Sequence, residues 1–174
     1  MNWIVTEVDG KVASIAADYR HFAKIAAEIA EMKPGDVNAV STRKISTEQL
    51  IELSKTLGWE DLRLFGTAFQ KKVWKTLFDM PRKLYSYTDF AAMAENPSGV
   101  RAVAHAVAFN PVAYVIPCHL IVPKEAMDKA KEIRAIAEKT LFKGSDLYLL
   151  DSIDVGEYAY GAELKRELIK LQLA

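Results

Sequence analysis

The single cysteine, Cys118, is the feature that most constrains the fold of this chain. One thiol excludes an internal disulfide and any zinc site built from several cysteines. The 174 residues must therefore fold on an apolar core without covalent cross-links. With 51% hydrophobic and 26% charged residues, the chain has the composition to form such a core. A chain of this length holds one domain or two small ones.

Charge and hydropathy set the first limits on function. The chain has no apolar run of about 18 residues and no basic-then-apolar start, so we expect a cytoplasmic protein without membrane contact. A net charge of zero, taken alone, argues against a nucleic-acid-binding protein. Residues 65–122, however, carry six basic and three acidic side chains and form the only positive segment of the chain.

Residues 1–62 have the pattern of a small α/β unit. Asp9-Gly10 lies between two loosely alternating runs and predicts a hairpin of strands 3–8 and 11–16. The elements expected after it are a helix over 19–32, a short strand over 37–40 and a helix over 49–57 with a capping interaction from Ser46. This unit contains no constellation of catalytic side chains.

Residues 63–122 read as a second, mainly helical segment. Three helices are predicted over 68–78, 89–95 and 99–109, the first two capped by Thr67 and Thr88. Phe69, Val73, Trp74 and Leu77 share one face of the first of these helices. Extended pieces are expected at 85–87 and 120–122. The second and third helices are short and joined by a tight turn, which is the helix-turn-helix pattern, although such pairs also occur as plain packing units.

The third of these helices is slim and carries two polar side chains on one face. Alanine occupies positions 102, 104, 106 and 108, and Arg101 lies four residues before His105. A slim helix can approach a nucleic-acid groove closely, and an arginine on it can contact phosphate or replace a base. The alternative is that the alanines pack against a neighbouring helix while Arg101 is solvated.

Cys118 is preceded by Pro117 and followed by His119 at the end of the apolar run 112–116. A thiolate is the nucleophilic form of cysteine, and an adjacent imidazole can help to form it. On the dipeptide alone, a structural cysteine beside an unrelated histidine is the simpler interpretation. The neighbouring motifs decide between these two interpretations.

The C-terminal third is predicted to be helical at both ends. A helix with one apolar stripe is expected over 123–142, closed by Gly144, and a last helix over 163–173. Between them, 147–150 forms a strand or a loop anchor, and 156–161 is a flexible aromatic loop. No repeat, phosphate-binding loop or metal-ligand cluster is evident, so we expect no cofactor.

An ordered set of short motifs runs through the chain. It comprises Gly66-Thr67-Ala68-Phe69-Gln70, Val73-Trp74, Pro81, Ser86-Tyr87, Arg101-Ala102-Val103, Asn110-Pro111 and Ile116-Pro117-Cys118-His119. This set closely resembles the O6-alkylguanine-DNA alkyltransferases (methylated-DNA–protein-cysteine methyltransferases). The resemblance covers 65–122 and resumes at 156–172, whereas residues 1–62 resemble that family only in size and general character.

The resemblance implies a fold and a reaction. The fold is α+β, with a small N-terminal α/β domain (1–62) and a mainly helical, winged-helix-like domain (63–174) that contains the helix-turn-helix and an inserted helical segment at roughly 123–155. The reaction is the irreversible transfer of an alkyl group from O6 of guanine in double-stranded DNA to the protein's own cysteine. The nucleotide is flipped out of the duplex for this step. A monomer without a cofactor is expected.

Roles for individual residues follow from the same resemblance. Catalytic roles fall to Cys118 as acceptor, His119 as base through a water, Asn110 as organiser of the turn before the cysteine, and Gln172 behind the histidine. DNA contacts are expected from Arg101, which fills the vacated stack, and from Tyr87, Ser98, Ala102 and His105. Tyr87 also donates to the guanine ring. The guanine pocket is expected to be lined by Tyr158, Ala159, Tyr160 and Val122.

The chain departs from the family pattern at four places. Leu120 stands where an arginine is usual, and Lys83 stands where a glycine is usual. Gln172 occupies the place of a glutamate that partners the histidine, so it can orient His119 but cannot stabilise its cation by charge. The segment 123–155 falls between the cysteine and the pocket loop, where it is positioned to reshape the substrate entrance.

Three other functions compete with alkyl transfer. The first is a lesion-binding, alkyltransferase-like protein that flips alkylated guanine without taking the group, although in such proteins the cysteine is replaced. The second is a DNA-binding regulator in which Cys118 is structural. The third is a Cys-His hydrolase, which the lack of a third orienting residue and of an oxyanion motif disfavours.

Overall fold

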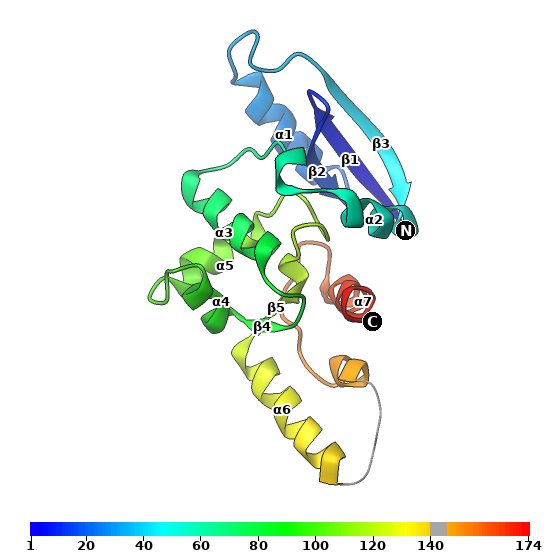
Figure 1. Cartoon of the computed structure of the whole chain (residues 1–174), viewed down its shortest axis with the longest axis vertical. Coiled ribbons are helices and arrows are strands. Elements are labelled where there is room, and N and C mark those ends of the chain that lie inside the picture. Colours follow the sequence, from blue (N-terminus) through cyan, green and yellow to red (C-terminus); the bar gives the residue numbers. More distant parts are fainter. Residues whose placement is uncertain (140–145) are drawn as a thin grey trace. The chain divides into compact units, whose positions relative to one another are not determined.

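The computed structural model describes residues 1–139 and 146–174 (Figure 1). The chain divides into two compact units. Unit 1 consists of Met1–Asp79 and Phe109–Pro117, and unit 2 consists of Met80–Ala108 and Cys118–Ala174. The chain therefore passes between the units three times, and Cys118 begins the second part of unit 2.

A three-stranded antiparallel sheet forms the centre of unit 1. In the order β2-β1-β3, its strands are β1 (Asn2–Val8), β2 (Lys11–Ala16) and β3 (Val40–Ser46). The predicted hairpin is confirmed, and its turn residues Asp9 and Gly10 have φ values of 51° and 80°. Positive φ at both central positions is the requirement of a type I′ turn. Helix α1 (Arg20–Ala30) packs against β2, and Ile25 joins Val8 and Ala13 in a small core.

The strand predicted over 37–40 is wrong in position. Strand β3 begins at Val40, and its first five residues are exposed, so that only Ile45 is buried. It is an edge strand of the sheet, bonded to β1 on one side. Because an exposed edge strand needs no alternating apolar residues, its sequence carries none of the periodicity on which strand prediction depends.

Two other helices of unit 1 begin at reciprocal caps. The helical elements are α2 (Thr47–Thr56), the 3-10 turn η1 (Trp59–Asp61) and α3 (Ala68–Asp79). Ser46 and Gln49 form a capping box at α2, and Thr67 and Gln70 bond each other's backbone in the same way at α3. Val73, Trp74 and Leu77 of α3 are buried as predicted, whereas Phe69 is 37% exposed.

A helix pair and a short parallel strand pair form the first part of unit 2. The elements are β4 (Tyr85–Ser86), α4 (Tyr87–Met93), α5 (Val100–Ala108), the 3-10 turn η2 (Cys118–Leu120) and β5 (Ile121–Val122). Helices α4 and α5 pack against each other, and β4 pairs with β5. The predicted cap at Thr88 is wrong, because Ser86 Oγ accepts from Asp89 N at 3.0 Å. Tyr87 is therefore the first residue of α4.

The last part of unit 2 contains α6 (Lys124–Lys139), the 3-10 helix η3 (Asp146–Asp151) and α7 (Ala162–Leu173). These confirm the helices predicted at both ends of the segment. The predicted end of the first one, with Phe142 and Gly144, lies outside the described residues. A strand over 147–150 is wrong, since these residues lie in η3, where Leu149 and Leu150 are buried.

The chain is thus a mixed helix-and-sheet protein, as expected from the sequence. In the ranges 1–139 and 146–174, no helix combines the length and the apolar character needed to cross a bilayer.

Candidate active site

The backbone that leads into Cys118 is held by Asn110. This side chain is 5% exposed, donates from Nδ2 to the Ile116 carbonyl at 2.7 Å and accepts at Oδ1 from Val112 N at 3.0 Å. The turn it closes includes Tyr114 at a φ of 69°. An amide that both donates and accepts can satisfy two buried backbone groups at once, and this fixes the chain two residues before the cysteine.

Cys118 is a free thiol at the start of η2, and it is partly exposed. The residues after it are buried: His119, Leu120 and the strand β5 have no more than a trace of accessible surface. The sulfur therefore lies at the boundary between core and solvent, where a substrate can reach it and the protein can control its surroundings.

His119 is fully buried, and burial lowers the pKa of its imidazole to about 3. Hydrogen bonding with Gln172 on α7 acts in the opposite direction, while the positive charges of Lys165 and Arg82 lower this pKa further. The ring is accordingly neutral at physiological pH. A neutral imidazole can accept a proton, as a general base must, but a pKa of about 3 makes His119 a weak base near neutral pH.

Lys165 is a member of this site that the sequence did not predict. Its side chain is 1% exposed and its Nζ donates to the Glu157 carbonyl at 3.3 Å. Burial lowers the pKa of Lys165 to about 8, and the charges of Cys118 and Asp154 oppose this shift. An ammonium beside a thiolate stabilises the thiolate electrostatically, so Lys165 supports the reactive form of Cys118.

A signal for Lys165 is present in the sequence. Leu164, Leu168 and Ile169 form the buried stripe of α7, and Lys165 falls inside it. A lysine at a core position of an amphipathic helix is uncommon without a function, because burying its charge is costly.

Two tyrosines border the cysteine. Burial, followed by the charges of Cys118 and Glu157, raises the pKa of Tyr87 to about 12. Burial, followed by Cys118 and Tyr160, raises the pKa of Tyr158 well above its usual value. Both phenols therefore keep their protons and are available as hydrogen-bond donors. We call Cys118, His119, Lys165, Tyr87 and Tyr158 the Cys118 cluster.

The remaining residues predicted for the guanine pocket lie in two kinds of place, the aromatic loop and the buried core. Tyr160 lies edge-on to Tyr158 with ring centroids 5.5 Å apart, and Ala159 between them is exposed. Val122 is fully buried in β5, where it pairs with Ser86. The loop thus presents aromatic side chains near Cys118, whereas the Val122 side chain belongs to the core.

Four of the five residues predicted to contact DNA form an exposed surface of unit 2, whereas the fifth, Tyr87, belongs to the Cys118 cluster. Ser98, two residues before α5, and Arg101, Ala102 and His105 on its outer side are all exposed and follow one another at the i, i+3, i+4, i+7 spacing. We call these four residues the α5 face. Val103, Ala106 and Val107 occupy the opposite, buried side of the helix. Only some of the alanines therefore pack inward, and Arg101 is directed away from the core.

No metal site accompanies these groups in the described ranges, where no three histidine, cysteine, aspartate or glutamate side chains come together.

Known proteins resemble the central part of this chain. Residues 68–140 match the family model described as "6-O-methylguanine DNA methyltransferase, DNA binding domain". A probable methylated-DNA–protein-cysteine methyltransferase of Acanthamoeba polyphaga mimivirus is 48% identical over 65 residues, which are 37% of this chain and 44% of that relative. A methylated-DNA–protein-cysteine methyltransferase of Haemophilus influenzae is 43% identical over 61 residues, or 34% of each chain. The matches thus span less than half the length of these two relatives.

The fold likeness extends further than the sequence likeness. The crystal structure of O6-methylguanine-DNA methyltransferase from the hyperthermophilic archaeon Pyrococcus kodakaraensis strain KOD1 matches 99% of this chain and 92% of its own, with a TM-score of 0.57 and 24% identity. The family match also continues to residue 140 and so includes α6. The resemblance predicted from the motifs is confirmed for this part of the chain.

Proposed function

We propose that this chain, whose residues 68–140 match the DNA-binding domain of the 6-O-methylguanine DNA methyltransferases, repairs O6-alkylated guanine in double-stranded DNA by moving the alkyl group to Cys118. One observation carries the proposal. A partly exposed free thiol lies beside a fully buried, neutral His119 and within electrostatic range of the buried Lys165. This combination favours an activated cysteine over a structural one.

The reaction follows from the protonation states in the Cys118 cluster. Neutral His119 takes the thiol proton through a water, and the Lys165 ammonium stabilises the resulting thiolate. The sulfur attacks the alkyl carbon, a carbon–sulfur bond forms and the carbon–oxygen bond breaks. The electron pair of the broken bond returns to the guanine, a proton from the neutral phenol of Tyr87 completes the released base, and the thiol proton passes from His119 through water to restore the phenol. No cofactor is required, and the thioether ends the reaction after one turnover.

Two side chains position the cysteine and the histidine for this reaction. Asn110 holds the turn before Cys118, and the Gln172 amide orients the His119 ring without adding a negative charge. The aromatic loop with Tyr158, Ala159 and Tyr160, together with the backbone of Val122, provides the wall of the guanine pocket in this proposal.

The α5 face supplies the DNA contacts in this proposal. Helices α4 and α5 act as a helix-turn-helix within a winged-helix-like domain, and Arg101 enters the base stack when the nucleotide leaves it. Removing a base from the stack costs a few kcal/mol, which an inserted side chain and groove contacts offset. Ser98, Ala102 and His105 lie beside Arg101 on the same exposed surface and contact the backbone. Tyr87, at the start of α4, assists the flip.

The domain assignment and the setting of the protein stay predictions. We assign residues 63–174 to the DNA-binding and catalytic domain, with an insertion at roughly 123–155, and residues 1–62 to a small N-terminal domain. A monomer suits a protein that acts once on a duplex lesion. We propose the cytoplasm as its location, because a reducing compartment keeps the Cys118 thiol available.

The direct test is the intact mass of the protein after incubation with duplex DNA that contains O6-methylguanine. We expect a gain of one methyl group per molecule, located in the peptide that contains Cys118, after which the reaction stops. The Cys118→Ser variant should bind the duplex and gain no mass, since a hydroxyl is far less ionised than a thiol at neutral pH.

The competing functions give different results in the same experiment. A lesion-binding protein would retain the modified duplex without any mass gain, and a hydrolase would turn over many substrate molecules. Tight binding of the methylated duplex without alkylation of wild-type Cys118 would overturn the transferase proposal in favour of a lesion sensor.

A further inference from the structure

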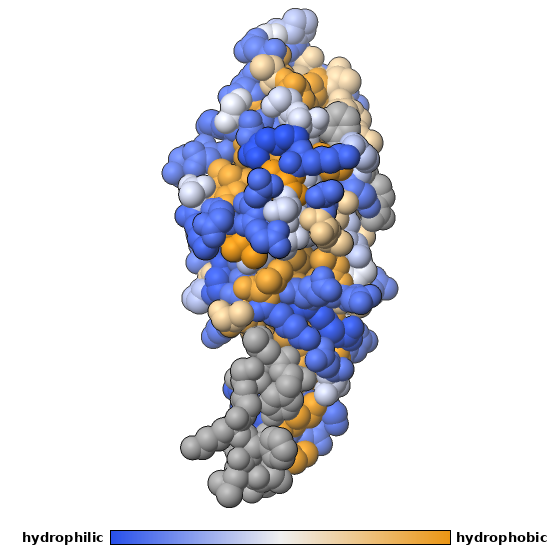
Figure 2. Space-filling view, turned by 90° about the vertical axis from the view of Figure 1, so that its right-hand side faces the viewer, coloured by the Kyte–Doolittle hydropathy of each residue, from blue (hydrophilic) through white to orange (hydrophobic). Residues whose placement is uncertain are grey.

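On the face shown in Figure 2, hydrophobic side chains lie in small groups among hydrophilic ones and do not form one broad apolar patch. A pocket in unit 2 lies outside the Cys118 cluster. Its volume is about 580 Å³, within the range of roughly 300–1,000 Å³ that holds small ligands. It is lined by Lys83, Leu84, Met127, Ala130, Lys131, Arg134, Leu149, Leu150, Ile153, Leu173 and Ala174.

One face of α6 forms a wall of this pocket. Met127, Ala130, Lys131 and Arg134 have the i, i+3, i+4, i+7 spacing that places them on a single helix face. The segment 123–155 carries six basic and seven acidic side chains, so its net charge is −1. The face that lines the pocket nevertheless presents two cations and no carboxylate. The average charge of the segment therefore hides a local positive site.

The floor of the pocket is apolar and firmly held. Leu149, Leu150 and Ile153 are buried at the end of η3 and just after it. Arg166 of α7 donates from Nε to the Leu150 carbonyl at 3.0 Å and from Nη2 to the Ile153 carbonyl at 3.1 Å. Because one guanidinium satisfies both carbonyls, the floor is built before any ligand arrives.

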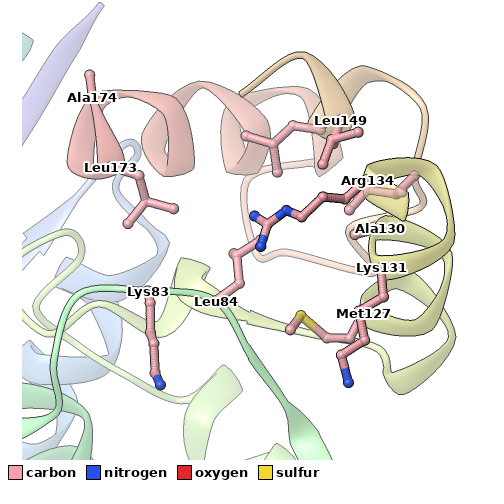
Figure 3. Close-up of a pocket in the computed structure, with 11 residues that line it drawn as sticks. Lys83, Leu84, Met127, Ala130, Lys131, Arg134, Leu149, Leu173 and Ala174 are labelled. Atoms are coloured by element: carbon pink, nitrogen blue, oxygen red, sulfur yellow. The ribbon is translucent and has the colours of Figure 1, made fainter. Parts of the chain in front are cut away.

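One of the cations of the lining, Arg134, reaches across the pocket. Figure 3 shows the Arg134 side chain extending from α6 across the pocket, opposite α7 with Leu173. Lys83, Lys131 and Arg134 are all exposed, so the charged groups lie on the solvent side of the pocket. Three cationic side chains and no acidic side chain line the pocket. A guanidinium matches the geometry of carboxylate and phosphate groups through paired hydrogen bonds.

We propose that this pocket binds an organic anion with an apolar body, its carboxylate or phosphate group on Arg134 and its hydrocarbon part on Leu149, Leu150 and Ile153. The site lies outside the residues that carry the proposed alkyl transfer. It therefore stands or falls independently of that function. Under this proposal, the segment 123–155, which the sequence identified only as an insertion, forms part of a binding site for an organic anion.

The test uses decanoate as the probe and the full chain as the protein. Titration calorimetry should show saturable binding, and backbone amide signals should shift within 127–134 and 149–153. Decanol, which lacks the charge, and inorganic phosphate, which lacks the apolar part, should each bind at least about tenfold more weakly, because each loses one of the two kinds of contact. Decyl phosphate, compared with decanoate, identifies which head group the site prefers.

Matched variants on α6 separate specific recognition from general attraction. Arg134→Leu should weaken decanoate binding about tenfold or more and leave decanol binding unchanged within about twofold. Lys129→Leu removes a cation from the same helix, but Lys129 is paired with Glu132 at 3.3 Å and does not line the pocket. The decanoate affinity of the Lys129→Leu variant should stay within about twofold of the wild-type affinity. Ala130→Phe, which fills the pocket, should weaken both ligands.

Three results would overturn the inference. Equal affinity for decanoate and decanol would show that the head group is not recognised. Equal weakening by Arg134→Leu and Lys129→Leu would show general charge attraction. Amide shifts scattered outside 127–134 and 149–153, with native circular dichroism, would place the ligand elsewhere. A mass gain at Cys118 is measured separately, so it neither supports nor weakens this result.

Discussion

The Cys118 cluster and the α5 face belong to the same unit, but different physical effects govern them. In the Cys118 cluster, burial sets the protonation states: it keeps His119 neutral, keeps Tyr87 and Tyr158 protonated and lowers the pKa of Lys165 to about 8. On the α5 face, Ser98, Arg101, Ala102 and His105 are exposed, and their helical spacing sets their arrangement. In the proposed function, chemistry thus depends on the interior of the unit and DNA contact on its surface.

This difference separates two kinds of substitution. A change in the Cys118 cluster should alter the chemical step and so affect every substrate. A change on the α5 face should alter only the steps that require a duplex. Comparing methylated duplex DNA with free O6-methylguanine base therefore tests the division directly, because the free base need not be flipped.

The largest rate effect is expected for Lys165→Met. This change removes the cation near Cys118 and retains an apolar chain in the buried site, so the thiolate loses electrostatic support. We expect transfer at neutral pH to slow about 100-fold on both substrates, as for the loss of one preorganised electrostatic contact. Single-turnover rates on the methylated duplex and on the free base measure this slowing. The difference from wild type should shrink above pH 8, where Lys165 itself loses its proton.

Lys170→Met is the matched control for this variant. Lys170 lies on the same helix and pairs with Asp151 at 2.8 Å on the surface. Its loss should leave transfer within about twofold of wild type, since exposed ion pairs contribute little. Equal slowing by both variants would assign the effect to α7 as a whole and remove Lys165 from the chemistry.

A smaller and more selective effect is expected for Arg101→Ala. Without a side chain to fill the vacated stack, repair of duplex DNA should slow about tenfold or more, while the free base should react within about twofold of the wild-type rate. Lys129→Ala, an exposed cation on α6, controls for the loss of one positive charge. Equal losses on duplex and free base would remove Arg101 from the flipping role and break the division between the two regions.

Local sequence signals predicted most elements of the fold. Asp9-Gly10 indicated the hairpin because few other residue pairs adopt positive φ at two successive positions. Caps indicated the starts of α2 and α3, since Ser46 and Thr67 precede glutamines at the capping-box distance. At α4, the sequence predicted a cap at Thr88, whereas the structure caps the helix with Ser86, which pairs with Val122 in β5. That pairing joins distant segments and is not visible locally.

The site was less predictable than the fold. Spacing alone placed Arg101 and His105 on one face, because a helix surface follows directly from sequence periodicity. The protonation states of His119 and Lys165 depend on burial among side chains from α7, η2 and the loop 154–158, which no local pattern reports. Lys165 was missed although it falls inside the apolar stripe of α7, and Gln172 was found only through a resemblance.

A moderate effect, of opposite sign, is expected for Gln172→Glu. The amide now hydrogen-bonds with His119 without charge, whereas a carboxylate would raise the pKa of the imidazole from about 3 and stabilise the cation that forms during transfer. We expect a gain of about two- to fivefold in the rate at neutral pH, on both substrates. Gln172→Met, which keeps the bulk and removes the hydrogen bond, should slow transfer. A rate that is unchanged in both variants would show that Gln172 does not act through His119.

The last expected effect concerns stability and not rate. Burial lowers the pKa of His119 from 6.5 to about 3 in the folded protein, so between these values the unfolded chain binds a proton that the folded chain does not. Stability should therefore fall as pH falls from 6.5 toward 3, with a slope that approaches about 1.4 kcal/mol per pH unit from this one group. Lys165, with its pKa lowered from 10.5 to about 8, should make stability rise with pH between those values.

Urea unfolding at a series of pH values measures both slopes. His119→Gln should remove the acid slope, and His105→Gln on the exposed α5 face should retain it. If both histidine variants retain the acid slope, burial of His119 does not control its charge, and the contrast between the interior and the surface of unit 2 fails at its most buried residue.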